Sequence, residues 1–187
     1  MKYRIAIILL LFLVCSNAFA QHPEFGNISA EEIKDQSQLE DSISDAIVLY
    51  KGRETHFEYH GVEGWYLVTQ MHQRVKVLDK KGVARATKKI RYYSDENRKQ
   101  EIYDVEGFTY NFKEGKVDKE KLEKEGIFNL VINDNWQETS FTLPNVKVGS
   151  VVEYRYKVLS DFLKIDDLIL QEDIPVKKYY AKISTPQ

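Results

Sequence analysis

The sequence contains a single cysteine, Cys15, and this residue lies in a segment that we expect to be removed on export. A mature chain without cysteine has no disulfide and no thiol nucleophile. The apolar run Ile5–Val14 is about half as long as the roughly 20 residues that a membrane-spanning helix needs. The sequence also lacks a basic run and a glycine-rich phosphate loop, which argues against a nucleic-acid partner and against a nucleotide site.

The N-terminus has the order of a secretory signal peptide. Two basic residues precede an apolar run that ends at Val14, and a stretch of small residues ends at Ala20. We expect residues 1–20 to be removed and the chain to reach the periplasm, the outer cell envelope or the medium, without a transmembrane segment. The alternative is a lipoprotein signal with Cys15 as the lipidated residue, although Val14 stands where such a site favours Gly, Ala or Ser.

The remaining chain is mildly acidic and long enough for a core. Removal of residues 1–20 takes two of the 27 basic residues and none of the 29 acidic ones, so the formal net charge changes from −2 to −4. A chain of this length buries roughly 70% of its unfolded surface. Residues 21–45 are polar, and Ser29 followed by Glu32 has the spacing of a capping box, which predicts a short helix. Residues 46–187 form the predicted β-rich domain.

Alternation of apolar and polar residues dominates from Ala46 onward, as in strands with one buried face. Between Trp65 and Leu78 this pattern predicts a buried set of Trp65, Leu67, Met71, Val75 and Val77. It predicts a set facing water of Gln70, His72, Arg74 and Lys76. Between Val151 and Val158 it likewise predicts that Val152, Tyr154, Tyr156 and Val158 are buried while Glu153, Arg155 and Lys157 face water.

Turn residues divide the rest of the region into short segments. Residues 79–82 are expected to form a hairpin loop, 84–93 its returning strand, and 118–125 one helical turn. Two strands are expected on either side of Glu106-Gly107, and others over 127–132, 136–143, 166–171 and 176–183. Nine or ten short strands with almost no helical period predict an all-β, mostly antiparallel fold, as a β-sandwich or an open barrel-like sheet with one short N-terminal helix.

The residues His56, Glu58 and His60 are the strongest metal candidate, since they would point to the same side of a strand. Residues four apart in a strand lie about 13 Å from each other, whereas zinc is held at about 2 Å from each nitrogen. The spacing therefore disfavours a metal site, and we predict neither a metal nor a cofactor.

Paired carboxylates are the next candidate, because a glycosidase needs two held about 5 to 10 Å apart. The pairs Asp166-Asp167 and Glu172-Asp173 are sequence neighbours, which point to opposite faces of a strand, so we interpret them as solvated acids. Asn133-Asp134-Asn135 lacks the glycine and the distal glutamate of a calcium loop and is interpreted as a turn.

A serine nucleophile is also disfavoured. Ser150 follows Gly149 but lacks the G-x-S-x-G elbow of a hydrolase, so we interpret it as a turn residue. We therefore predict no catalytic, cofactor-binding or metal-binding residue. A hydrolase that uses carboxylates or His72 on a strand face is the least favoured hypothesis.

Several segments are similar to a known family. The chain resembles domain of unknown function 3857, a module found ahead of transglutaminase-like domains in exported bacterial proteins of the Bacteroidetes type. The segments that carry this resemblance are Asp45–Tyr50, Arg74–Leu78, Leu143–Tyr154 and Asp173–Val176. The similarity runs from Phe25 to Pro186, and because such proteins usually continue into further domains, we expect the β-rich domain to be truncated at its C-terminal end, with a short paralogue as the alternative.

The resemblance implies an envelope-located β module that accompanies an enzyme-like domain, and its biochemical role is not established. The enzyme-like part of such proteins looks like a Cys, His and Asp arrangement, which the mature chain has no cysteine to match. We expect a non-catalytic structural or interaction module of a transglutaminase-like envelope protein, with a C-terminal transglutaminase-like domain or another envelope protein as partner. The alternative is a glycan- or peptide-binding β-sandwich, motivated by an excess of aromatic residues, although Trp65, Tyr154 and Tyr156 are expected in the core.

Overall fold

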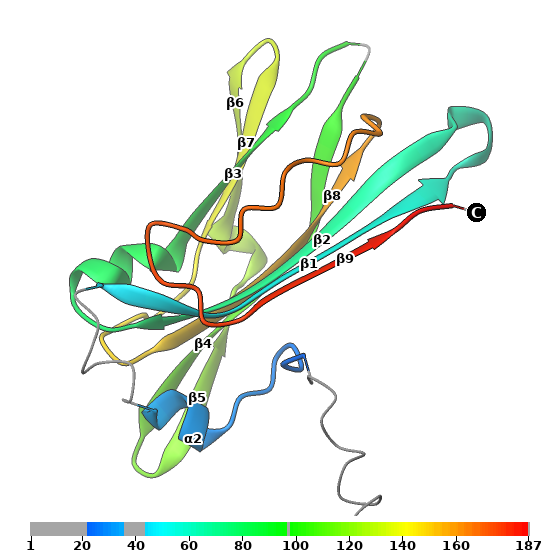
Figure 1. Ribbon diagram of the computed structural model, residues 1–187. Helices are drawn as coiled ribbons and strands as arrows, with labels where there is room; N and C mark the ends of the chain where they lie inside the picture. The colour runs from blue at the N-terminus through cyan, green and yellow to red at the C-terminus, as the bar shows by residue number, and fades with distance from the viewer. Residues whose placement is uncertain (1–21, 36–43, 97, 187) are drawn as a thin grey trace, which may run out of the picture.

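The computed structural model describes residues 22–35, 44–96 and 98–186 (Figure 1). The predicted signal peptide, residues 1–20, lies outside the described residues. The elements in chain order are α2 (Ala30–Lys34), β1 (Ala46–Tyr59), the 3-10 turn η2 (Gly61–Glu63), β2 (Trp65–Val77), η3 (Lys81–Ala86), β3 (Thr87–Tyr93), β4 (Gln100–Lys113), β5 (Lys116–Lys121), η4 (Lys124–Gly126), β6 (Ile127–Asn133), β7 (Trp136–Thr142), β8 (Val151–Ser160) and β9 (Tyr179–Ser184).

The described strands form two open sheets. One has six strands in the order β5-β4-β8-β2-β1-β9, and the other has three in the order β3-β7-β6. Neighbouring strands are antiparallel except β1 and β9, which run parallel. The prediction of a mostly antiparallel all-β fold is confirmed, and the parallel pair makes the larger sheet mixed.

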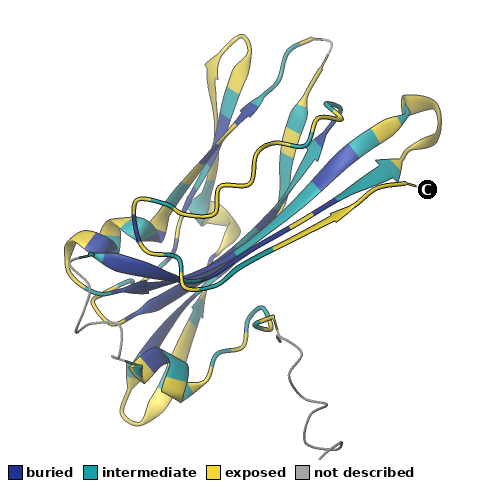
Figure 2. Ribbon diagram, viewed as in Figure 1, coloured by how far each residue is buried: buried dark blue, intermediate teal, exposed yellow. Residues whose placement is uncertain are grey.

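The main core lies between the two sheets, where their inner faces meet (Figure 2). Val75 and Val152 come from the larger sheet and Phe141 from the smaller one, and all three are buried. The rings of Phe141 and Tyr154 lie 5.4 Å apart, edge to face. Tyr154 and Tyr156 are buried as predicted. Trp65 is 44% exposed, so its predicted core position is wrong, because the β1–β2 hairpin projects beyond the second sheet (Figure 1).

The predicted hairpin between β2 and β3 is wrong. The chain passes through η3 and β3 then pairs with β7 in the smaller sheet, while β8 takes the place beside β2. Gly82 allows this crossing, because a Cβ atom there would clash with the Asp45 carbonyl oxygen.

Three other local predictions are also wrong. Residues 166–171 contain no strand and belong to a long connection from β8 to β9. The helical turn expected over 118–125 is wrong for most of its length, because the backbone up to Lys121 pairs with β4 as part of β5, and only the last two residues enter the 3-10 turn η4. The two strands expected around Glu106-Gly107 are one strand, β4, whose register shifts between Tyr103 and Glu106, with Asp104 at a φ of 52°.

The predicted N-terminal helix is confirmed as α2. The Oγ of Ser29 accepts a hydrogen bond from the backbone N–H of Glu32 at 3.1 Å, which is the expected cap. Ile33 is buried in a second apolar cluster with Tyr110 and Val151. Within the described residues, no helix has the length and apolar character needed to span a membrane.

Candidate functional site: a buried charge cluster under the N-terminal segment

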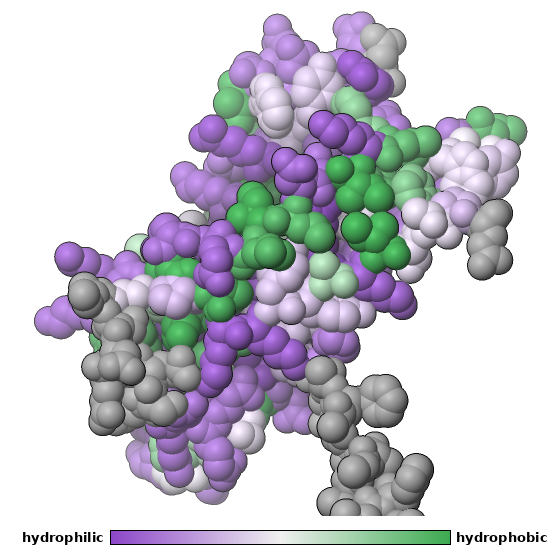
Figure 3. All heavy atoms as spheres, viewed as in Figure 1, coloured by the Kyte–Doolittle hydropathy of each residue, from purple (hydrophilic) through white to green (hydrophobic). Residues whose placement is uncertain are grey.

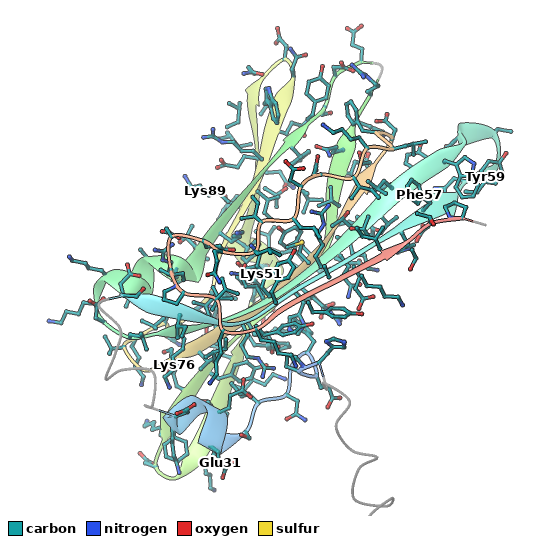
Figure 4. The ribbon with its side chains drawn as sticks, viewed as in Figure 1. Glu31, Lys51, Phe57, Tyr59, Lys76 and Lys89 are labelled. Carbon is teal, nitrogen blue, oxygen red and sulfur yellow. The ribbon has the colours of Figure 1, made fainter. Side chains whose placement is uncertain are left out.

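The outer face of the larger sheet carries charged side chains that are buried, although the alternation of the sequence predicts that they face water. Arg74 and Lys76 of β2 and Glu153 of β8 are at most 4% exposed. Their predicted solvent exposure is wrong because the N-terminal segment, residues 22–35, covers this end of the sheet (Figure 2). Lys76 lies on the side of β2 that faces α2 (Figure 4), where its ammonium donates to the carbonyl of Ile33.

Glu153 is the centre of the cluster, and both of its carboxylate oxygens are occupied. Oε1 accepts from His72 Nε2 at 2.7 Å and from Arg74 Nη2 at 2.7 Å. Oε2 accepts from the Tyr110 hydroxyl at 2.6 Å and from the backbone N–H of Gly26 at 3.0 Å. Four residues from two strands and the N-terminal segment, namely His72 and Arg74 of β2, Tyr110 of β4 and Gly26, therefore donate to a fully buried charge, as such a charge requires.

Arg74 joins the sheet to the N-terminal segment. Its Nη1 donates to both carboxylate oxygens of Glu32, at 2.8 and 3.0 Å. Its Nη2 also donates to the backbone carbonyl of Asn27 at 2.8 Å. One guanidinium thus pairs with a sheet carboxylate and with a helix carboxylate in the planar geometry that favours arginine over lysine.

Electrostatics keep the cluster charged. Burial acts to raise the pKa of Glu153, but the hydrogen bond from His72, the charge of Arg74 and the Tyr110 hydroxyl outweigh it and lower that pKa below its ordinary value. Burial and the neighbouring Glu153 raise the pKa of Tyr110, so its hydroxyl remains a donor. Burial lowers the pKa of Lys76.

Aromatic rings enclose the cluster. The ring of His72 meets Phe25 edge-on at 5.4 Å and Tyr50 at 5.0 Å. The guanidinium of Arg155 lies over the Phe25 ring, 4.2 Å from its centre. Under this cover, the side chain of His72 is 14% exposed.

The chemistry of this cluster is that of an anchor. A His beside a carboxylate is also part of a hydrolytic triad, but no hydroxyl of a described serine or threonine hydrogen-bonds to His72, and the carboxylate has no free oxygen. The cluster fixes residues 24–32 to the sheet. Sequence reasoning missed it because a charge on an alternating strand normally faces water, and the only signal was the complementary acid Glu32 in the N-terminal segment.

The three metal candidates lie together at the end of β1, with His56 and Glu58 in the strand and His60 directly after it. Glu58 stands between the two histidines, with Oε1 2.8 Å from His56 Nε2 and Oε2 3.1 Å from His60 Nε2. The hydrogen bonds from His56 and His60 lower the pKa of Glu58. The described residues contain no group of three or more His, Cys, Asp or Glu arranged to hold a metal ion.

The paired acids have structural partners. Glu172 lies 2.7 Å from the ammonium of Lys51, and Asp173 lies 2.7 Å from Arg85 Nη2. In the preceding pair, the Asp167 backbone carbonyl accepts from Arg53. The structure does not bring these carboxyl groups together around one site.

The two turn predictions agree with the structure. Asn133 Oδ1 accepts from the backbone N–H groups of Asn135 and Trp136 at 3.0 Å each, which closes the turn between β6 and β7. The buried hydroxyl of Ser150 donates to Asn111 at 2.6 Å and accepts from the N–H of Lys147.

Comparison with known families identifies this fold. The sequence profile of the domain of unknown function DUF3857 matches residues 67–187, and the chain belongs to this family. None of the curated proteins matches the chain.

A crystal structure from Parabacteroides distasonis, of a protein described as a "putative protease", has a similar fold. It superposes with a TM-score of 0.63 at 14% sequence identity. The match covers 78% of this chain but 30% of the Parabacteroides chain, so this chain spans less than a third of its length.

Proposed function

We propose that this chain is a non-catalytic structural and interaction module of an exported cell-envelope protein, in which it accompanies a larger enzyme-like domain. The signal-peptide pattern of residues 1–20 supports the location. The match to under a third of a longer protein supports the role of a companion domain. The internal pairing of the Glu153 cluster supports a structural use of its charges.

The proposal rests mainly on one observation, the exposed apolar surface of the β6–β7 hairpin. Strand β6 is the edge of the smaller sheet, and every residue after Ile127 is exposed (Figure 2). The exposed large apolar side chains of the hairpin are Phe128, Leu130, Val131, Ile132 and Trp136. Soluble proteins rarely leave such a concentration of apolar side chains uncovered unless it is an interaction site.

The sequence of β6 adds a second argument. An exposed edge strand invites pairing by another strand, and proteins usually protect such edges with charges or proline. Residues 127–133 contain neither. We assign the companion domain as the occupant of this surface, because the related fold in Parabacteroides distasonis forms part of a much longer chain.

Co-purification tests this assignment. The companion domain is co-expressed as a separate polypeptide with the wild-type chain, with Leu130→Lys on β6 and with Ile183→Lys on β9. Both positions are exposed apolar residues on edge strands, so the two variants are matched. Loss of binding with Leu130→Lys alone is expected. Retention by both variants, or loss with Ile183→Lys alone, would overturn the assignment.

Turnover tests the non-catalytic role. The purified chain is expected to cleave peptide and ester substrates, and to transfer acyl groups, no faster than a heat-denatured control. Turnover above that control would contradict the proposal.

A glycan- or peptide-binding module is the second candidate, favoured by one observation. Tyr59, at the end of the β1–β2 hairpin (Figure 4), is exposed. Trp65 is also exposed, and the centroids of the two rings lie 5.2 Å apart. Exposed aromatic rings form binding platforms. Retention on peptidoglycan or polysaccharide beads that Trp65→Ala abolishes would support this candidate, and no retention would count against it.

A further inference from the structure

A buried arginine lies on the inner face of the larger sheet, where the connection 161–178 crosses the opening between the two sheets (Figure 1). Apolar side chains gather on the surface along this connection (Figure 3). Arg53 of β1 is 9% exposed. Its Nε donates to the Thr55 hydroxyl at 3.3 Å and its Nη1 to the backbone carbonyl of Asp167 at 3.0 Å. Among the described residues, its Nη2 makes no hydrogen bond and no carboxylate lies within 4.0 Å of the guanidinium.

Two other buried cations, unlike Arg53, have carboxylate partners. Lys51, two residues earlier on the same face, lies 2.7 Å from Glu172 (Figure 4). Arg74, on the opposite face of the sheet, has both Glu153 and Glu32. Arg53 has no carboxylate at ion-pair distance, and its Nη2 still reaches solvent-accessible space, so it can bind an anionic partner that the chain does not supply.

Arg53 lines a cavity with a volume of about 170 Å³ between β1, β2, β8 and the connection 161–178. The cavity also contains Lys164 and Asp166, which gives it two cationic side chains and one anionic one. Leu67, Met71 and Val158 supply an apolar wall. The volume suits a single amino-acid side chain or a small ring better than an extended ligand.

Tyr156 is a second polar group of this cavity without a partner. It is 8% exposed, and its hydroxyl makes no hydrogen bond to any described residue. Burial, with a contribution from Glu172, raises its pKa to about 12, so the hydroxyl keeps its proton and donates. An unpaired guanidinium and an unpaired phenol donor therefore line the same cavity.

We propose that this cavity binds the carboxylate group of a small acidic ligand, with Arg53 and Tyr156 as donors and Leu67, Met71 and Val158 against the attached carbon atoms. A planar carboxylate accepts from a guanidinium fork and from a hydroxyl together. A monoanion also balances the excess of one positive charge in the lining. The carboxylate comes from an acidic side chain of a peptide or from an acidic sugar. The site is separate from the β6 surface, so it does not depend on the companion domain.

Acetate is the first probe, in an NMR titration of the purified full chain at constant ionic strength. So small a ligand binds weakly, and concentrations up to about 100 mM cover the expected range. Saturable shifts are expected at the Arg53 Nε–H and at the Met71 methyl group. A charge-assisted hydrogen bond contributes roughly a factor of 10 or more to affinity, so Arg53→Gln should weaken binding by at least about tenfold.

Two variants separate binding from folding. Tyr156→Phe removes one oxygen atom and is expected to keep the fold while it weakens acetate several-fold. Arg155→Gln, a change to a half-exposed arginine on the outer face of the same sheet, is the matched control and should leave acetate affinity unchanged. The proposal would be overturned if the wild type showed no saturable shift, or if Arg53→Gln and Tyr156→Phe both bound acetate as tightly as the wild type does.

Larger probes then identify the source of the carboxylate. The peptide Ala-Glu-Ala and glucuronate are titrated beside inorganic phosphate. The tighter binder of these two, if it also binds more tightly than acetate, identifies the ligand class, because it also fills the apolar side of the cavity. Tighter binding of phosphate than of acetate, or weaker binding of both larger carboxylates, would overturn the assignment.

Discussion

Replacement of Arg74 by Met tests the buried charge cluster most sharply. Methionine keeps an unbranched apolar stem like that of arginine, but it lacks the guanidinium that pairs with Glu153 and Glu32. Glu153 then remains fully buried with His72, Tyr110 and the Gly26 N–H as its only donors.

The expected loss is large. Removal of one partner from a buried ion pair costs about 3–5 kcal/mol, because the other charge stays uncompensated. Domains are stable by roughly 5–15 kcal/mol, so the free energy of unfolding should fall by a substantial fraction. Addition of Glu153→Gln to Arg74→Met should recover part of the loss, because the buried carboxylate is then neutral.

Urea unfolding measures the change, and hydrogen exchange at the Gly26 amide reports whether the N-terminal segment is released. Lys157→Met is the control, since Lys157 lies on the same strand as Glu153 but pairs with Asp104 at a half-exposed site. That change should cost at most about 1 kcal/mol. Equal losses for Arg74→Met and Lys157→Met, with an unchanged Gly26 amide, would refute the reasoning.

The remaining predictions concern pH, the core, one glycine and one surface residue. The pKa of Glu153 is lowered by folding, so its contribution to stability is present above the ordinary glutamate range and is lost as pH falls through the folded value; unfolding at successive pH values should show this loss in the wild type and less of it in Glu153→Gln. Phe141→Ala should lower the free energy of unfolding in urea by about 3–5 kcal/mol, because it leaves a cavity in the main core, and a loss below about 1 kcal/mol would contradict the buried position of Phe141. Gly82→Ala should destabilise by about 1–3 kcal/mol or more, because its Cβ would meet the Asp45 carbonyl oxygen, and unchanged thermal unfolding would contradict the close approach. Leu130→Lys should change stability by less than about 0.5 kcal/mol, since the side chain is exposed, and a larger loss would place it in the fold instead of at an interface.

Local patterns predicted much of the fold. The capping box at Ser29 and Glu32 located α2, and the alternation from Val151 to Val158 located β8 with its buried tyrosines. These succeeded because caps and strand periods depend on a few neighbouring residues. The turn at Asn133 was readable for the same reason.

Pairing between distant segments was not readable. The hairpin expected after β2 failed because the choice of partner for β3 depends on the space already taken by β8. The segment 118–125 has a helix-like composition, yet β4 offers its backbone a neighbouring strand. In both cases a tertiary contact outweighed the local preference.

The candidate site was missed for a related reason. Alternation places Glu153 and Arg74 on the outer face of the sheet, which is correct, but it carries no information on what covers that face. Residues 22–35 supply the cover, with Glu32 and the Gly26 N–H as ligands of the charges. The isolation of Arg53 is likewise a property of the assembled sheets and of the connection that crosses them.

The proposed role of the chain is to dock a companion through the uncovered edge of its smaller sheet. This role is best tested by hydrogen exchange along β6 with and without the companion polypeptide. The β6 amides that point away from β7 are expected to exchange fast in the free chain and to be strongly protected in the complex, while exchange along β9 stays unchanged. Binding of the companion that leaves β6 exchange unaltered would contradict it.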